Sequence, residues 1–144
     1  MFSKACEYAI KAAIYIAQQS QQQRTVNVKD VSVSIDAPVA FTAKILQLLC
    51  RGGILQSVRG KQGGFFFDPE KQKQHRIFDV VHLIDGDGLF FKCGLGLKNC
   101  SSDNPCPVHY DFKVVRDKLF EMTHKHTFHD LATKTENGLA WLRN

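Results

Sequence analysis

A seventeen-residue stretch, CGLGLKNCSSDNPCPVH at residues 93–109, contains three of the five cysteines in the chain and one histidine. Thiolates and imidazoles are the side chains that hold zinc ions and iron-sulfur clusters in proteins. The rest of the stretch is rich in Gly, Ser, Asn and Pro, so its backbone is able to wrap around an ion or a cluster. The local candidate ligands are Cys93, Cys100, Cys106 and His109.

The spacing of these ligands favours a cluster over a single zinc ion. Six residues separate Cys93 from Cys100, five separate Cys100 from Cys106, and two separate Cys106 from His109. Structural zinc sites usually take their cysteines in close pairs, roughly two to four residues apart. An iron-sulfur cluster is larger and suits thiolates that are spread along one flexible loop. A structural zinc, or three reduced thiols without metal, are the alternatives.

Three thiolates leave one coordination position open, and two residues are candidates for it. His109 lies close behind Cys106, near the start of a predicted helix. Glu7 lies in the first turn of the N-terminal helix, where the helix dipole favours an acid, and its carboxylate is the other candidate. Cys6 and Cys50 fall on faces of predicted helices, so we expect both to be buried as small apolar residues.

The composition indicates what class of protein contains this site. With 144 residues and 44% hydrophobic content, the chain is long enough to fold as one domain with its own core. It has no run of about eighteen apolar residues and no signal-peptide pattern, so we expect a cytoplasmic protein without a membrane partner. Five cysteines, an odd number, argue against a disulfide framework in that compartment.

Positive charge is concentrated in the first half of the chain. Residues 1–76 carry eleven Lys and Arg against five Asp and Glu, whereas residues 77–144 carry eight against nine. A basic segment of this kind is the electrostatic footprint of a protein that binds a polyanion. We therefore expect nucleic acid to contact residues 1–76.

Hydrophobic periodicity predicts a helix-turn-helix and a hairpin in this basic half. An Ala-rich helix with two apolar faces covers residues 3–19, and such a helix needs cover on both sides. Two further helices follow, the second beginning near Pro38 and ending at Gly52. A short strand, a Gly-rich turn and an aromatic strand come next, at residues 54–68. This order is that of a winged helix.

Three more helices are predicted around the cysteine loop. Residues 77–85 are amphipathic, and a longer helix follows the loop. Because its apolar residues form a narrow stripe, we expect that longer helix to meet another helix. Thr127 is expected to cap a last short helix, and Trp141 and Leu142 to dock the tail. The stripe consists of Val108, Phe112, Val115, Leu119 and Met122, spaced four, three, four and three.

Two segments of the basic half carry candidate DNA contacts. The N-terminal turns of the second helix of a helix-turn-helix enter the major groove. A basic hairpin tip with small glycines enters a minor groove or lies along phosphates. The candidates on the helix are Thr42, Ala43, Lys44 and Gln47. Those on the wing are Ser57, Arg59, Gly60 and Lys61.

In this order, the elements resemble those of the iron-sulfur cluster regulators and nitric-oxide-sensitive repressors, a family of small winged-helix bacterial transcription factors. The resemblance runs almost from end to end, and the SVRG-x-x-GG wing together with the cysteine loop is its specific part. The segments that carry it are SKACEYAIKAAIYIA, CRGGILQSVRGKQGGF, IFDVVHLIDG and the cysteine loop running into PVHYDFKVVRDKL.

The resemblance implies a homodimeric transcriptional regulator, not an enzyme, that binds a roughly palindromic operator in double-stranded DNA and has no small-molecule substrate. The helix with the Val108 to Met122 stripe would cross its twin. Each subunit would place one recognition helix in a major groove and Arg59 in a minor groove. Ala43 departs from the polar residue expected at a base-reading position.

The resemblance also implies the cofactor, because Cys93, Cys100 and Cys106 match the cluster ligands of the family. His109 matches the branch that holds a [2Fe-2S] cluster. Glu7 stands where the nitric-oxide-sensing branch supplies a carboxylate from the partner subunit to a [4Fe-4S] cluster. The cluster would then report redox state, nitric oxide or iron-sulfur status.

The predicted fold class is therefore mainly α with a small β-hairpin wing. Residues 1–76 form the winged helix-turn-helix DNA-binding domain, and residues 77–144 form the cluster-binding loop and the dimerisation helix region. A winged-helix DNA-binding protein with a structural zinc or no metal is the alternative. An electron-transfer protein, or a winged helix that serves only protein contacts, would show no affinity for DNA.

Overall fold

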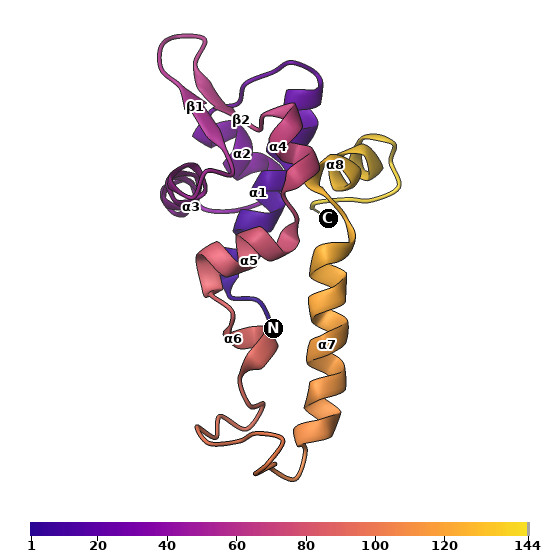
Figure 1. Cartoon of the computed structure of the whole chain (residues 1–144). Coiled ribbons are helices and arrows are strands. Elements are labelled where there is room, and N and C mark those ends of the chain that lie inside the picture. Colours follow the sequence, from indigo (N-terminus) through magenta and orange to yellow (C-terminus); the bar gives the residue numbers. More distant parts are fainter. Residues whose placement is uncertain (144) are drawn as a thin grey trace.

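The computed structural model describes residues 1–143, and Asn144, the last residue of the predicted second region, lies outside this range. The fold is mainly α with one two-stranded antiparallel sheet, as the sequence predicts (Figure 1). The strands are β1 (Gln56–Val58) and β2 (Gly64–Phe66). The helices are α1 (Lys4–Gln21), α2 (Val28–Ile35), α3 (Val39–Arg51), α4 (Pro69–Gln74), α5 (Ile77–Asp85), α6 (Gly88–Phe91), α7 (His109–Lys125) and α8 (Phe128–Glu136).

Helix α1 is central to the main core because its small side chains let other helices approach closely from several sides. It contacts α2, α3, α5 and α8. Ser3 caps the helix, and its hydroxyl accepts a hydrogen bond from the Cys6 amide at 3.0 Å. The prediction that both apolar faces of this helix need cover is confirmed. The fully buried residues of α1 are Cys6, Ala9, Ala12, Ala13, Ile16 and Ala17.

Helices α2 and α3 form the predicted helix-turn-helix. Their axes are bent by 109° relative to each other, within the roughly 90–120° that is usual for this motif. Asn27 caps α2 by accepting a hydrogen bond from the Asp30 amide. The chain then turns at Asp36, whose φ of 53° is in the left-handed region that Asp tolerates. The cap and the turn together set the direction in which α3 leaves.

None of the helices within residues 1–143 is by itself long and apolar enough to cross a membrane, and the bent pair α2 and α3 meets that test only when both are counted together.

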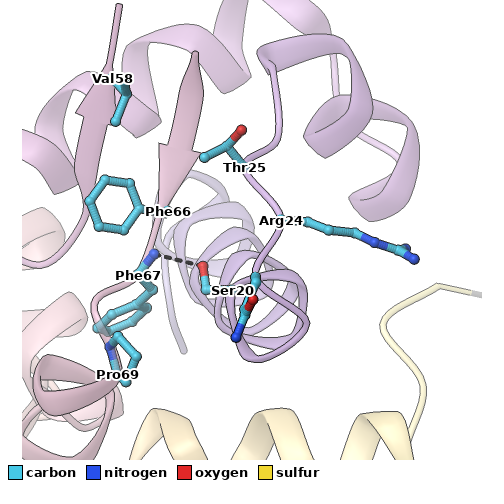
Figure 2. A pocket seen from close by; sticks show the side chains of 8 residues that line it. Ser20, Arg24, Thr25, Val58, Phe66, Phe67 and Pro69 are labelled. Carbon is cyan, nitrogen blue, oxygen red and sulfur yellow. Dashed lines mark hydrogen bonds between the residues drawn. The ribbon is translucent and has the colours of Figure 1, made fainter. Parts of the chain in front are cut away.

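The predicted wing is present and is joined to the body at its base. Ser57 pairs with Phe65 across the two strands, and Phe65 also pairs with Val26 ahead of α2. Below the strands, the Ser20 hydroxyl of α1 accepts a hydrogen bond from the Phe67 amide at 2.9 Å (Figure 2). At the tip, a Cβ on Gly63 would lie 2.1 Å from the Val58 carbonyl oxygen, so the turn requires glycine there.

Helix α4 is an element that the periodicity analysis missed, because it has no apolar stripe. Its buried residue is Gln72, which is fully enclosed. The Gln72 amide donates hydrogen bonds to the carbonyl oxygens of Phe67 and Ala17, at 2.8 and 3.3 Å. A short helix held by a buried polar side chain leaves no hydrophobic period in the sequence.

Helix α7 stands beside α5 and α6 and extends away from the body of the molecule (Figure 1). Its buried residues are His109 and Thr123. In the predicted stripe, Val115 is 60% exposed and Met122 is 42% exposed. The apolar stripe of α7 is thus largely exposed to solvent on a single chain.

Helix α8 returns to the body and completes the main core. Thr127 and Asp130 form a capping box at its start, as the sequence predicts for this pair. Phe128 and Ala132 are fully buried and belong to the same core cluster as the alanines of α1. The core therefore contains residues from both sides of residue 76.

The prediction that the tail docks through Trp141 is wrong, because Trp141 is 80% exposed. Leu142 does pack partly against the core. The Arg143 guanidinium donates a hydrogen bond to the Val33 carbonyl oxygen at 2.9 Å. Contacts at the two following residues hold the tail, and the Trp141 ring is left in solvent.

Candidate metal centre and nucleic-acid interface

The loop between α6 and α7 brings the three predicted cysteine ligands together. The Sγ atoms of Cys93, Cys100 and Cys106 all lie within 4.8 Å of one another. The Sγ atoms of Cys93 and Cys106 lie 3.7 Å apart. All five cysteines of the chain are free thiols.

Two contacts fix this loop against α7. The Arg116 guanidinium donates a hydrogen bond to the Lys92 carbonyl oxygen at 2.8 Å. Gly94 packs against Phe112 so closely that a Cβ there would lie 2.4 Å from the ring. The start of the cysteine loop is therefore attached to the first and second turns of α7.

His109, the first residue of α7, lies next to the thiols. Its Nδ1 atom is 3.2 Å from the Cys100 Sγ atom, and the side chain is 92% buried, since the residue is only 8% exposed. The Cys106 amide also donates to the Cys100 Sγ atom, at 3.4 Å. Three thiols and one imidazole thus meet on one loop, a donor set that fits an iron-sulfur cluster or a structural zinc.

Glu7 is not part of this group on the same chain. It lies in the first turn of α1, and its carboxylate forms an ion pair with Lys4 at 3.1 Å. Its predicted role is toward the cluster of a partner subunit, so that role stays a prediction.

The environments of the cysteines separate two kinds of thiol. Backbone N–H groups of Leu97 and Leu95 lower the pKa of Cys93 to about 7. Because metals and clusters bind thiolates, this thiol is ready to act as a ligand at neutral pH. By contrast, burial and the nearby Asp85 carboxylate raise the pKa of Cys6 to about 12. Cys6 is fully buried and behaves as the small apolar residue that the sequence predicts.

Helix α3 presents only part of the predicted DNA-contacting set. Lys44 and Gln47 are exposed, and Ala43 is partly exposed. Thr42 is fully buried, and its hydroxyl donates a hydrogen bond to the Pro38 carbonyl oxygen at 2.8 Å. The expectation that Thr42 contacts DNA is therefore corrected, because its side chain faces the core and stabilises the first turn of α3.

The wing presents all four of its predicted contacts to solvent, namely Ser57, Arg59, Gly60 and Lys61. No Asp or Glu among residues 1–143 forms an ion pair with Arg59, Lys61 or Lys44. Cations without a carboxylate partner are available to phosphates. The recognition helix and the wing therefore carry unpaired positive charge.

Sequence reasoning missed Arg24, which lies in the loop between α1 and α2. This exposed residue borders a polar groove of about 550 Å³ between that loop and the tip of the wing. Lys61 lines the same groove. In Figure 2 the Arg24 side chain points away from the apolar pocket at the base of the wing. A single arginine after a run of glutamines has no motif around it, so only its place beside the wing marks it.

Comparison with known proteins identifies the family. Residues 2–134 match the Rrf2 family, which is described as an iron-dependent transcriptional regulator. The chain belongs to the Rrf2 family. A protein of Aquifex aeolicus named as an HTH-type transcriptional regulator is 30% identical over 141 residues, covering 96% of each chain. Protein aau3 of Rhizobium meliloti is 25% identical over 130 residues, covering 90% of this chain and 82% of the relative.

Solved structures of Rrf2-type regulators share the fold of this Rrf2 protein. CymR of B. subtilis, described as its global cysteine regulator, superposes with a TM-score of 0.75, covering 92% of this chain and 96% of CymR at 16% identity. IscR of T. potens gives a TM-score of 0.74, covering 97% and 91% at 18% identity. The predicted winged-helix fold is confirmed, and the chain is a transcriptional regulator, not an enzyme.

Proposed function

We propose that this Rrf2 regulator binds an iron-sulfur cluster through Cys93, Cys100 and Cys106, with His109 as the fourth ligand. The convergence of the three Sγ atoms within 4.8 Å carries the proposal. His109 is preferred to Glu7 because its Nδ1 atom lies 3.2 Å from Cys100 on the same chain. Of the two cluster types, a histidine ligand supports [2Fe-2S] rather than [4Fe-4S].

When bound, an iron-sulfur cluster supplies a group that reacts with oxidants and nitric oxide and that depends on iron supply. The residues of this chain connect its site to the rest of the molecule. Arg116 and Phe112 hold the loop against α7. Phe120 of α7 packs against Phe78 of α5 and Phe90 of α6, with ring centroids 5.6 and 5.5 Å apart. A change in the loop is therefore passed to α7 and α5.

The same helices lead to the DNA-binding half. Helix α5 contacts both α1 and α3, so a movement of α5 reaches the recognition helix. A second copy of the chain would cover the exposed stripe on α7, since Val115 and Met122 stand open to water. In such a homodimer, the position of α7 sets the separation of the two α3 helices. A palindromic site requires about 34 Å between its half-sites.

On the DNA, the exposed side chains divide into two groups. Lys44 and Gln47 of α3 would enter the major groove, with Ala43 as an apolar contact. Arg59 would enter the minor groove, with Ser57, Gly60 and Lys61 along the backbone. Residues 1–76 would then bind the operator, and the region after residue 76 would sense and dimerise. We place this action in the cytoplasm, where the operator lies.

The test is an anaerobic preparation of the full chain, followed by visible absorption and by analysis of iron and sulfide. The wild type should show cluster absorption, and Cys100→Ala should lose it. Cys50→Ala is the matched control, because Cys50 is a half-buried cysteine on α3, away from the loop. An unchanged spectrum in Cys100→Ala would reject the site.

Two further variants separate the fourth ligands. His109→Ala should change the spectrum or weaken retention of the cluster, whereas Glu7→Gln should leave both unchanged. The opposite result would assign the position to Glu7 of the partner subunit. Three cysteines and one histidine also form a common structural zinc site. If the metal analysis finds one zinc ion per chain and no sulfide, the site binds structural zinc and not a cluster.

A further inference from the structure

We propose that Cys93 and Cys106 form a redox-active pair that closes an intrachain disulfide when the loop holds no metal. The bond would keep the site from binding metal until it is reduced. The formation of the bond depends only on the position of the two thiols. Its effect on metal binding rests on the function proposed above.

The two sulfur atoms are already in contact. Cys93 Sγ lies 3.7 Å from Cys106 Sγ, and a disulfide needs a separation of about 2 Å. Cys93 lies two residues after the end of α6, and Cys106 precedes the start of α7 by three residues. The segment between them has no helix or strand and includes Gly94 and Gly96. Closing the remaining distance requires a change in this irregular backbone, which contains no helix or strand hydrogen bonds that the change would break.

Cys100 is the thiol that the contacts keep out of this bond. Its Sγ atom lies 3.2 Å from His109 Nδ1 and accepts a hydrogen bond from the Cys106 amide at 3.4 Å. A bond from Cys100 to either other thiol would pull it from these partners. The Cys93 Sγ atom accepts hydrogen bonds from the Leu95 and Leu97 amides of the same loop. The pair Cys93 and Cys106 is nevertheless the one pair that leaves the Cys100 contact with His109 in place, so the structure favours it over the other two pairs.

The order of reaction follows from access. A surface cavity of about 460 Å³ is lined by Cys93 and Cys100, together with Phe91 and two lysines. Cys106 is not among its lining residues and is only 9% exposed. Within the proposed pair, a small oxidant therefore reaches Cys93 before Cys106, and Cys106 then attacks Cys93 from the protein side.

The oxidant class is a hydroperoxide, and the chemistry balances with hydrogen peroxide. The Cys93 thiolate attacks one peroxide oxygen, an S–O bond forms, the O–O bond breaks, and hydroxide leaves and takes up the proton that the thiol released. The Cys106 sulfur then attacks the Cys93 sulfur, and the sulfenic oxygen leaves as water with the Cys106 proton. Two thiols are oxidised to one disulfide, and one peroxide is reduced to two waters.

The bond removes two of the four candidate ligands. Only Cys100 and His109 would remain, and two ligands do not complete a tetrahedral metal site. A loop that has lost its metal in the presence of peroxide would not bind new metal until a thiol reductant cleaved the disulfide. The disulfide would thus persist after the peroxide has been consumed.

The first experiment treats the metal-free full chain with one equivalent of hydrogen peroxide without air, followed by alkylation in denaturant, so that buried thiols also react, and by peptide mass spectrometry. Alkylatable thiols should fall from five to three per chain, with residues 93 and 106 joined. Cys100→Ser should form the same bond, and Cys106→Ser should accumulate a sulfenic acid on Cys93 that dimedone traps. A bond to Cys100, a bond between chains, or no loss of thiols would overturn the proposal.

The second experiment titrates the reduced and the oxidised chain with Co²⁺ and measures thiolate-to-cobalt charge-transfer absorption. The reduced chain should bind cobalt, the oxidised chain should not, and dithiothreitol followed by its removal should restore binding. Equal binding by both forms would overturn the blocking role. If peroxide forms the disulfide in the first experiment, but the reduced chain binds neither cobalt nor a cluster, the proposed metal site is wrong and the redox pair is still supported.

Discussion

Replacing Lys61 by Gln should lower the salt dependence of DNA binding by an amount that the structure sets. Lys44 near the N-terminus of the recognition helix and Arg59 and Lys61 on the wing are exposed cations that have no ion-pair partner within residues 1–143, and they are the cations proposed to contact DNA. If each displaces one counterion from DNA, the proposed dimer displaces about six, and log Kobs falls with log salt at a slope of about −5.4. Without Lys61 the number is about four and the slope about −3.6.

The assay is fluorescence anisotropy with one mixed-sequence duplex, because counterion release does not depend on the operator. Between about 50 and 200 mM salt, the wild type should lose about three decades of affinity and the Lys61→Gln variant about two. Lys118→Gln is the matched control. It removes the same charge from α7, where Lys118 pairs with Glu121 at 3.4 Å, and it should keep the slope of the wild type.

Equal slopes for Lys61→Gln and the wild type would refute the placement of the wing on the DNA backbone. An equal decrease in slope for Lys61→Gln and Lys118→Gln would show that net charge, and not the position of the wing, controls binding.

Arg59→Ala should weaken binding to the operator by about 1–3 kcal/mol and relax its sequence preference, because a base contact is lost; a loss that is equal on operator and random DNA would contradict base reading. Thr127→Ala should lower the free energy of unfolding by about 1 kcal/mol in a urea titration, since the Asp130 amide loses its cap. The Thr127 amide also donates to the Asp130 carboxylate and lowers the pKa of Asp130 below the ordinary 3.8, so the stabilisation from this second hydrogen bond is present above that pH and is lost as the pH falls through the lowered value. Asp130→Asn should remove this contribution to the pH dependence of the free energy of unfolding. The same decrease in stability at acid pH in the variant and the wild type would contradict the assignment. In the metal-free protein at pH 7, iodoacetamide should modify Cys93 long before Cys6, because their pKa values are about 7 and about 12; peptide mass spectrometry that finds Cys6 modified first would contradict these environments.

The elements that the sequence predicts well are those with local signals. Residues 77–85 were expected as a helix, and α5 has those bounds, because an amphipathic period followed by glycine is visible within one segment. The helix that follows Pro38 and the hairpin after Gly53 have equally local signals. Helices α4 and α6 are short, and a segment of six or four residues is too brief to establish a period.

The errors at single residues have a common cause. Thr42 was expected to contact DNA and Trp141 to dock the tail, yet Thr42 is fully buried and Trp141 is 80% exposed. The position of Thr42 depends on how α3 is rotated against its neighbours, and that of Trp141 on the path of the tail after α8. Both are decided by packing over the whole molecule, which no local pattern records.

By itself, the sequence determined the ligand chemistry and the order of the elements: three cysteines and His109 on one polar loop, behind a helix-turn-helix with a basic wing. Residue type and spacing are enough for this, because chemistry and period are properties of neighbours along the chain. Only the tertiary structure decided which thiols touch, that His109 joins them, and that the loop is attached to α7 through Arg116. Those contacts join residues that are brought together by the return of α7 along α5 and α6, and this return depends on side chains packed between elements that are distant in sequence.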